Sequence, residues 1–192
     1  MRAIISCRLY FIFALFFCFP LYAIPKNIDF SPLCQLFGHP LAAPVEVLDE
    51  NSHGDAVGCA TFASCGTFGA VAGGIKALWY WDKETGFQIL TTSLSVPGIK
   101  DDWFRFDRGQ FNFDRARINN NRIVACSYSA CWCVGCCCQV VSGWFWWTKK
   151  GGAHFSEFPS QCVAMIGIND KDQILFERYD GGQMIVDIHS KK

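Results

Sequence analysis

The chain has little charge of either sign. Charged residues make up 18% of its 192 residues, and 17 basic side chains balance 17 acidic ones. The longest basic run is Lys149-Lys150. A nucleic-acid-binding protein needs a basic stripe that displaces counterions from phosphates. We therefore expect no nucleic-acid partner.

Enzyme motifs are also missing from the sequence. No Gly-rich loop follows a strand and opens a helix to hold phosphate, and no serine stands in a hydrolase nucleophile turn. A cysteine nucleophile would need an adjacent imidazole, with His53 or His154 as the base. No cysteine lies in a recognisable nucleophile turn beside either histidine. We therefore predict no catalytic residue, no cofactor and no metal centre.

The one long apolar run near the N-terminus has the pattern of a signal peptide. Arg2 and Arg8 precede apolar residues 9–19, and Pro20 and the small residue Ala23 follow. Eleven residues in a helix are too short to cross a hydrocarbon core of about 30 Å. We expect removal of residues 1–23 and export to the periplasm, the cell surface or the medium. An uncleaved anchor that uses the longer run from Ala3 is the alternative.

A second uncharged stretch covers residues 123–147 and is long enough for a membrane span. It contains six cysteines, and its end alternates in the manner of a strand. We favour a buried sheet, and expect no membrane span once the signal peptide is removed.

Cysteine is abundant, with twelve in the chain and ten after residue 23. Export to an oxidising compartment makes disulfides the first interpretation. Cys59 and Cys126 occupy equivalent places in two similar segments, and Cys65 and Cys131 follow each of them closely. This suggests that each segment is stapled internally, although ten cysteines leave the pairing open. Soft-metal binding by the cysteines between residues 126 and 138 is the alternative.

Two parts of the chain repeat the same order of features. NSHGDAVG leads to ALWYWDKETGFQIL, and NNRIVA leads to GWFWWTKKGGAHF. A polar turn, a short β run, a variable middle and a tryptophan-rich strand therefore form a repeated unit. A third copy, GINDKDQILF, lacks the variable middle and the tryptophan strand, as a terminal capping repeat would.

Short apolar runs separated by turn residues predict an antiparallel sheet protein without helices. Residues 24–44 should form an extended lead-in and residues 189–192 a tail. Residues 102–114 alternate aromatic and polar residues, which indicates a hairpin and a remnant unit. Twelve strands, enough for about three four-stranded sheets, are expected at residues 45–48, 55–62, 75–81, 87–91, 103–106, 110–114, 122–128, 139–147, 153–158, 162–168, 173–179 and 183–188.

The turns contain residues that suit reversals of the chain. Glycines close the turns at 82–86, 149–152 and 180–182, where a positive φ is needed. Asn51, Asn119 and Asn169 open the other turns, where an amide side chain can bond the backbone two residues on. Calcium binding that involves Asp170 and Asp172 is an alternative, although each loop alone offers few oxygen ligands.

The tryptophans admit two interpretations, a buried core or an aromatic platform for sugars or peptides. Trp79 and Trp81 share one strand face, as do Trp144 and Trp146, so equivalent positions in two units favour repeated core packing. Trp147 points the other way, and we expect it to be the more exposed.

These segments resemble a known repeat. NSHGDAVG, ARINNNRIVA and GINDKDQILF are similar to the I-N-x-x-G-Q-I-V-G segment of HAF-type extracellular repeats, and the tryptophan strands resemble the A-F-L-W-x-G-x-L segment that follows it. The glycine of the motif is present as Gly54, is missing after Asn121 and is replaced by Asp172. The resemblance implies exported bacterial proteins with propeller-like sheets.

We therefore predict an all-β protein of antiparallel repeats over residues 45–188, arranged as a partial or open propeller-like array. Its expected function is a non-catalytic binding or scaffold module with a protein or carbohydrate ligand. Three blades cannot close a ring, so the array should stay open with a protected edge or close by self-association through sheet edges. The alternative function is a soft-metal-binding protein or cysteine-dependent enzyme.

Overall fold

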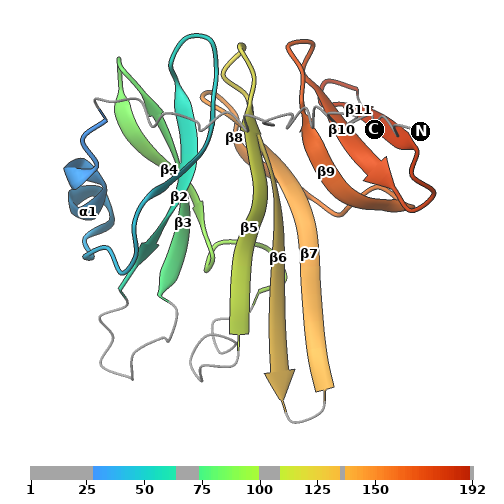
Figure 1. Cartoon of the computed structure of the whole chain (residues 1–192), viewed down its shortest axis with the longest axis horizontal. Helices are drawn as coiled ribbons and strands as arrows, with labels where there is room; N and C mark the ends of the chain where they lie inside the picture. The colour runs from blue at the N-terminus through green and yellow to red at the C-terminus, as the bar shows by residue number, and fades with distance from the viewer. Residues whose placement is uncertain (1–27, 64–73, 100–108, 135–136, 191–192) are drawn as a thin grey trace, which may run out of the picture.

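The computed structural model describes residues 28–63, 74–99, 109–134 and 137–190. The all-β prediction is confirmed, since this part of the chain forms three antiparallel sheets and one short helix (Figure 1). The elements are α1 (Ser31–Phe37), β1 (Glu46–Glu50), β2 (Ala56–Phe62), β3 (Ile75–Asp82), β4 (Gly86–Thr92), β5 (Gly109–Ile118), β6 (Val124–Val134), β7 (Cys137–Thr148), β8 (Gly152–Ser156), β9 (Cys162–Ile168), β10 (Gln173–Arg178) and β11 (Gln183–Asp187).

Each sheet corresponds to one copy of the repeat. The first sheet has the order β1-β2-β3-β4, the second β5-β6-β7-β8 and the third β11-β10-β9. The three sheets stand side by side in chain order as an open, propeller-like array (Figure 1). The third sheet has three strands because its copy of the repeat lacks the tryptophan strand, as the sequence indicated.

Alternating side chains supply an apolar layer on each face of the second sheet. Leu78 and Tyr80 from the first sheet pack with Phe145 and Trp147 from the second. On the other face of the second sheet, Trp144 packs with residues of the third sheet. Burial of these layers is the main stabilising contribution, because it removes large aromatic surfaces from water.

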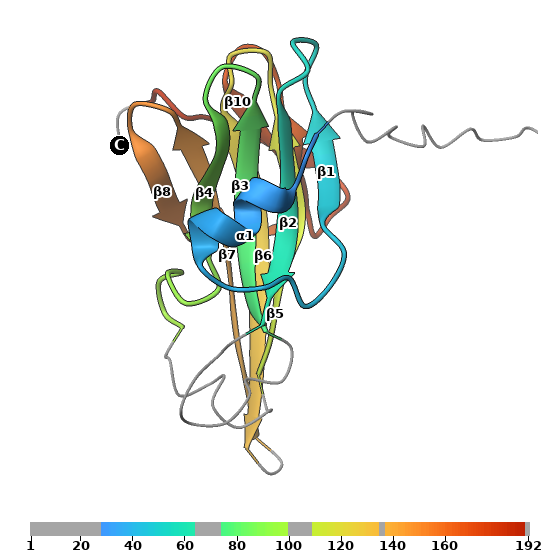
Figure 2. The same ribbon diagram turned by 90° about the vertical axis from the view of Figure 1, so that its left-hand side faces the viewer.

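The helix α1 corrects the prediction of a helix-free lead-in. It covers the outer face of the first sheet (Figure 2), where Leu33 is fully buried. Asp29 accepts hydrogen bonds from the backbone and the hydroxyl of Ser31 at the start of the helix, and Gly38 ends it with φ +74°. Seven residues give too short an apolar period for detection, and the neighbouring prolines indicated an extended chain.

The second sheet is longer than predicted. Strand β6 continues to Val134 rather than ending at residue 128, and β7 begins at Cys137. The uncharged stretch 123–147 is therefore mostly two paired strands, and the alternative of a membrane helix there is wrong. No helix within the described ranges has the length and hydropathy to cross a membrane.

The predicted hairpin at 102–114 lies only partly within the described residues. Its second half belongs to β5, which pairs with β6 as the first strand of the second sheet. The described part of the predicted remnant unit, from residue 109 on, is therefore the first strand of the second repeat. The strand expected at 103–106 lies outside the described residues.

Candidate functional site

The three asparagine turns join the sheets through a hydrogen-bond relay. The side-chain amide of Asn51 donates to the backbone carbonyl of Asn119 (3.1 Å), and the amide of Asn119 donates to the carbonyl of Asn169 (2.9 Å). In each turn the asparagine Oδ1 accepts the backbone N–H four residues on. One residue type thus closes its own turn and also binds the next sheet.

The next residue of each turn forms a second row of the relay. The backbone N–H of Ser52 donates to Oδ1 of Asn120 (3.0 Å), and that of Asn120 donates to Oδ1 of Asp170 (2.9 Å). Asp172 accepts hydrogen bonds from the amides of Asn119 and Asn121. The carboxylates considered for calcium are therefore engaged by neighbouring amides.

The fourth position has the same type of backbone conformation in all three turns. Gly54, Arg122 and Asp172 all have positive φ, at +79°, +62° and +60°. A non-glycine residue is strained in this region. At the two non-glycine positions the side chain makes contacts between units, since Arg122 reaches Asp55 in the first turn and Asp172 accepts from the second.

The relay ends at the third sheet. The amide of Asn169 donates to Oε1 of Gln173 in its own turn (3.1 Å), instead of to another repeat. Strand β11 alternates between exposed and half-buried residues, and its exposed positions are Gln183, Ile185 and Asp187. This supports the interpretation of the third copy as a cap, while α1 covers the opposite end.

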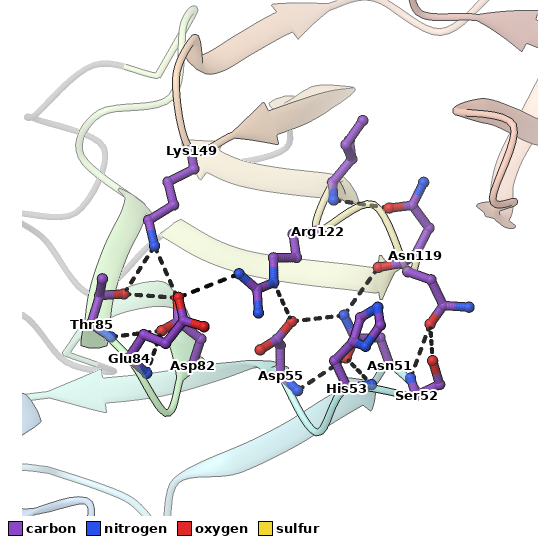
Figure 3. A network of polar contacts seen from close by, with 12 residues as sticks. Asn51, Ser52, His53, Asp55, Asp82, Glu84, Thr85, Asn119, Arg122 and Lys149 are labelled. Carbon is purple, nitrogen blue, oxygen red and sulfur yellow. Dashed lines mark hydrogen bonds and ion pairs between the residues drawn. The ribbon is translucent and has the colours of Figure 1, made fainter.

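Two ion pairs connect the first and second sheets beside the relay (Figure 3). Arg122 Nε lies 2.9 Å from Oδ2 of Asp55, a residue with 2% exposure. Lys149 Nζ lies 3.3 Å from Oδ2 of Asp82, which is fully buried. Each buried carboxylate thus has a cation from the neighbouring sheet, as burial of charge requires.

Asp82 is also held by its own turn. Thr85 donates from its backbone N–H (2.6 Å) and its hydroxyl (2.7 Å), and the Glu84 N–H donates at 2.8 Å. Burial acts to raise the pKa of Asp82, but these hydrogen bonds outweigh it and lower the pKa below its usual range. The carboxylate is therefore held in its charged form.

The equivalent cysteines of the first two units are free thiols that face the interface between their sheets. Cys126 is fully buried, and desolvation raises its pKa. Desolvation, together with a hydrogen bond to Glu46 (3.3 Å), raises the pKa of Cys59 to about 12. Neither thiol is therefore a thiolate at neutral pH.

Cys126 and Cys131 are both thiols, so neither forms the disulfide expected for the second unit, whereas Cys138 is disulfide-bonded. Cys126 and Cys131 lie five residues apart on the continuous strand β6, so their side chains point to opposite faces. Cys65, from the first unit, lies outside the described residues. Within those residues no three histidine, cysteine or acidic side chains are grouped so that they could hold a metal ion.

The histidines considered as bases contact other groups. His154 stacks on Trp146 with ring centroids 5.0 Å apart. His53 lies in the first turn, where its backbone N–H donates to Asn51.

Core packing of the tryptophans is confirmed for Trp79 and Trp144, which are 0% and 4% exposed. The expectation that Trp147 is exposed is wrong, because it is 7% exposed and packs against Tyr80 (5.1 Å between ring centroids). Alternation in the sequence assigned each tryptophan to the correct face of its strand. It could not show that neighbouring sheets cover both faces of the second sheet.

Trp81 is partly buried and lines a hollow of about 670 Å³ between α1 and the β3–β4 hairpin.

A groove of about 440 Å³ lies where the second and third sheets meet. Its floor comes from the second sheet, and its other side comes from the third sheet and the chain that leads to it. The floor residues are Asp114, Ser127, Ser129 and Ser142, and the remaining lining residues are Phe158, Cys162, Val163, Ala164 and Tyr179. These residues form no sequence motif, because they come from five separate segments that only the packing of the sheets brings together.

The groove has an ordered frame. Trp144 Nε1 donates to the carbonyl of Glu157 (2.8 Å), which fixes the segment beside Phe158. The backbone N–H of Tyr179 donates to the carbonyl of Gln161 (2.9 Å), while the Tyr179 side chain is 79% exposed. The side of the groove formed by the third sheet is therefore held in place by backbone hydrogen bonds, and the Tyr179 ring on it is exposed to solvent.

Comparison of the chain with protein-family models, curated proteins and solved structures gave no match.

Proposed function

We propose that this protein is an exported, non-catalytic β-repeat module that binds a ligand on the surface of its sheets. The observation that carries this proposal is that the buried carboxylates form ion pairs between sheets. Asp55 is paired with Arg122, and Asp82 with Lys149. Groups engaged in this way hold the array together and are not available for proton transfer.

The state of the thiols supports the non-catalytic assignment. A cysteine nucleophile acts as a thiolate, and the pKa of Cys59 is raised to about 12. Cys126 is inaccessible to a substrate because it is fully buried.

Export is supported by the pattern of residues 1–23 and by Cys138, which is disulfide-bonded, as is common in oxidising compartments. Membership of the HAF-type repeats is part of the proposal. The three asparagine turns, their shared positive-φ position and the sheet that follows each turn support it.

Two measurements test the proposal. The full chain expressed with its own leader should appear outside the cytosol with the intact mass expected after cleavage following Ala23. The exported protein should co-sediment with at least one of cellulose, chitin, peptidoglycan or purified cell envelope. Retention of the leader in a cytosolic product, or no co-sedimentation with any of the four, would contradict it.

The alternative of a soft-metal protein predicts a different result. Elemental analysis of the purified protein would then give stoichiometric zinc or copper, bound by the cysteines between residues 126 and 138. The proposed module should contain neither.

A further inference from the structure

We propose that the groove between the second and third sheets binds a neutral saccharide, with Asp114 and Ser129 as polar anchors and Tyr179 as the stacking wall. This rests on the proposed binding function and names the ligand class and its site. Its volume of about 440 Å³ lies within the range of about 300–1,000 Å³ usual for small-molecule sites.

The groove results from unequal strand lengths. Strands β6 and β7 have 11 and 12 residues, whereas β9, β10 and β11 have 7, 6 and 5. The second sheet therefore extends beyond the third, as Figure 1 shows for the β6–β7 pair. At the boundary a ligand can rest on the second sheet and against the side of the third.

The uncovered floor is polar. Ser129 lies directly opposite Ser142 in the β6–β7 pairing, and Ser129 Oγ donates to Asp114 Oδ1 (2.8 Å). This bond leaves the Ser129 oxygen able to accept and the second carboxylate oxygen of Asp114 available to a ligand hydroxyl. Hydroxyl and carboxylate groups side by side suit a ligand whose hydroxyls both donate and accept.

The wall supplies the apolar part of the site. Tyr179 is 79% exposed and Val163 is 42% exposed, and both line the groove with Phe158. The C–H face of a sugar ring can pack on an aromatic ring while its hydroxyls remain directed to the floor. A half-polar, half-aromatic groove fits this amphipathic shape.

Other ligand classes fit less well. An apolar partner would desolvate the serines and Asp114 without returning hydrogen bonds. A phosphate or sulfate would be repelled by Asp114. Lys76 acts on Asp114 electrostatically, which reduces the attraction for a cation and favours a neutral ligand.

The test uses saturation-transfer NMR and calorimetry on the full exported protein with cellotriose, chitotriose and maltotriose. At least one should bind with a Kd of about 1 mM or lower. Tyr179→Ala should weaken that binding by about threefold to tenfold, because the stacking surface is lost. Because Tyr179 is largely exposed, the variant should retain the thermal unfolding midpoint of the wild type.

A second pair of variants controls for folding. Ser142→Tyr places a ring in the groove and should abolish binding. Val140→Tyr adds the same ring two residues away on the same face of β7. Val140 is 67% exposed and does not line the groove, so this variant should bind the saccharide as the wild type does.

Failure of all three trisaccharides to bind overturns the inference. So does binding that both Tyr179→Ala and Ser142→Tyr leave unchanged. Co-sedimentation that persists in these variants would leave the proposed function standing and reject only this site.

Discussion

The side-chain amide of Asn51 donates a hydrogen bond to the backbone carbonyl of Asn119, 68 residues away in the chain. Both residues are buried, and both occupy the first position of a repeat turn. The contact therefore joins equivalent points of two repeats. Stacked repeats are stabilised by interactions between neighbouring units, and this bond is one such interaction.

The relay predicts unequal effects of the same substitution in two turns. Asn119→Asp keeps Oδ1 for its own turn but places a carboxylate oxygen against the carbonyl of Asn169 and the carboxylate of Asp172. We expect a loss of about 2 kcal/mol in the free energy of unfolding, measured by urea denaturation.

Asn169→Asp is the matched control. Its lost donor faces only Gln173, whose amide can rotate and donate in return. The expected change is below about 0.5 kcal/mol. Equal losses in the two variants would show that the bonds between turns contribute nothing.

Gly58→Ala should destabilise the first sheet. Gly58 lies opposite Trp79, and an added Cβ would collide with the backbone carbonyl of Glu46 and with the Trp79 ring. Overpacking of this kind costs about 1–3 kcal/mol. Gly167→Ala is the control, because its Cβ would meet only Arg117 at an ordinary 3.8 Å. If the two alanine variants unfold at the same urea concentration, the close packing of the Trp79 ring and the Glu46 carbonyl against Gly58 is contradicted.

The Asp82 carboxylate predicts loss of stability in acid. Its pKa is lower in the folded protein than the usual value of about 3.9. The unfolded chain therefore binds this proton first, and the stabilisation present above about pH 4 is lost as the pH falls further. Urea denaturation between about pH 6 and pH 2 should show this decrease, and Asp82→Asn should have a shallower dependence. A variant with the full wild-type slope would exclude Asp82 as its source.

Cys59 and Cys126 should resist alkylation in the folded protein. Their raised pKa values keep the thiols protonated, and Cys126 has no exposed surface. Treatment with N-ethylmaleimide at neutral pH, followed by peptide mass analysis, should leave both unmodified. In urea both should react. Rapid modification of Cys59 in the native protein would contradict the assigned environment.

Much of the fold could be read from local pattern, and the candidate groove could not. The limits of β9 match the predicted strand at residues 162–168, because alternation and turn residues are local properties. The asparagine turns were found for the same reason. Asp114, Ser142 and Tyr179 carry no local motif, and only the different lengths of neighbouring strands make them line one groove.

By itself the sequence determined an all-β chain of three repeat units with a shortened last copy, since strand period and turn chemistry act over a few residues. The tertiary structure decided which faces are covered. It buried Trp147, placed Cys126 and Cys131 on opposite sides of one strand, and ended the relay at Gln173. These outcomes depend on how one sheet packs against the next, and that packing is set by contacts between residues far apart in the chain.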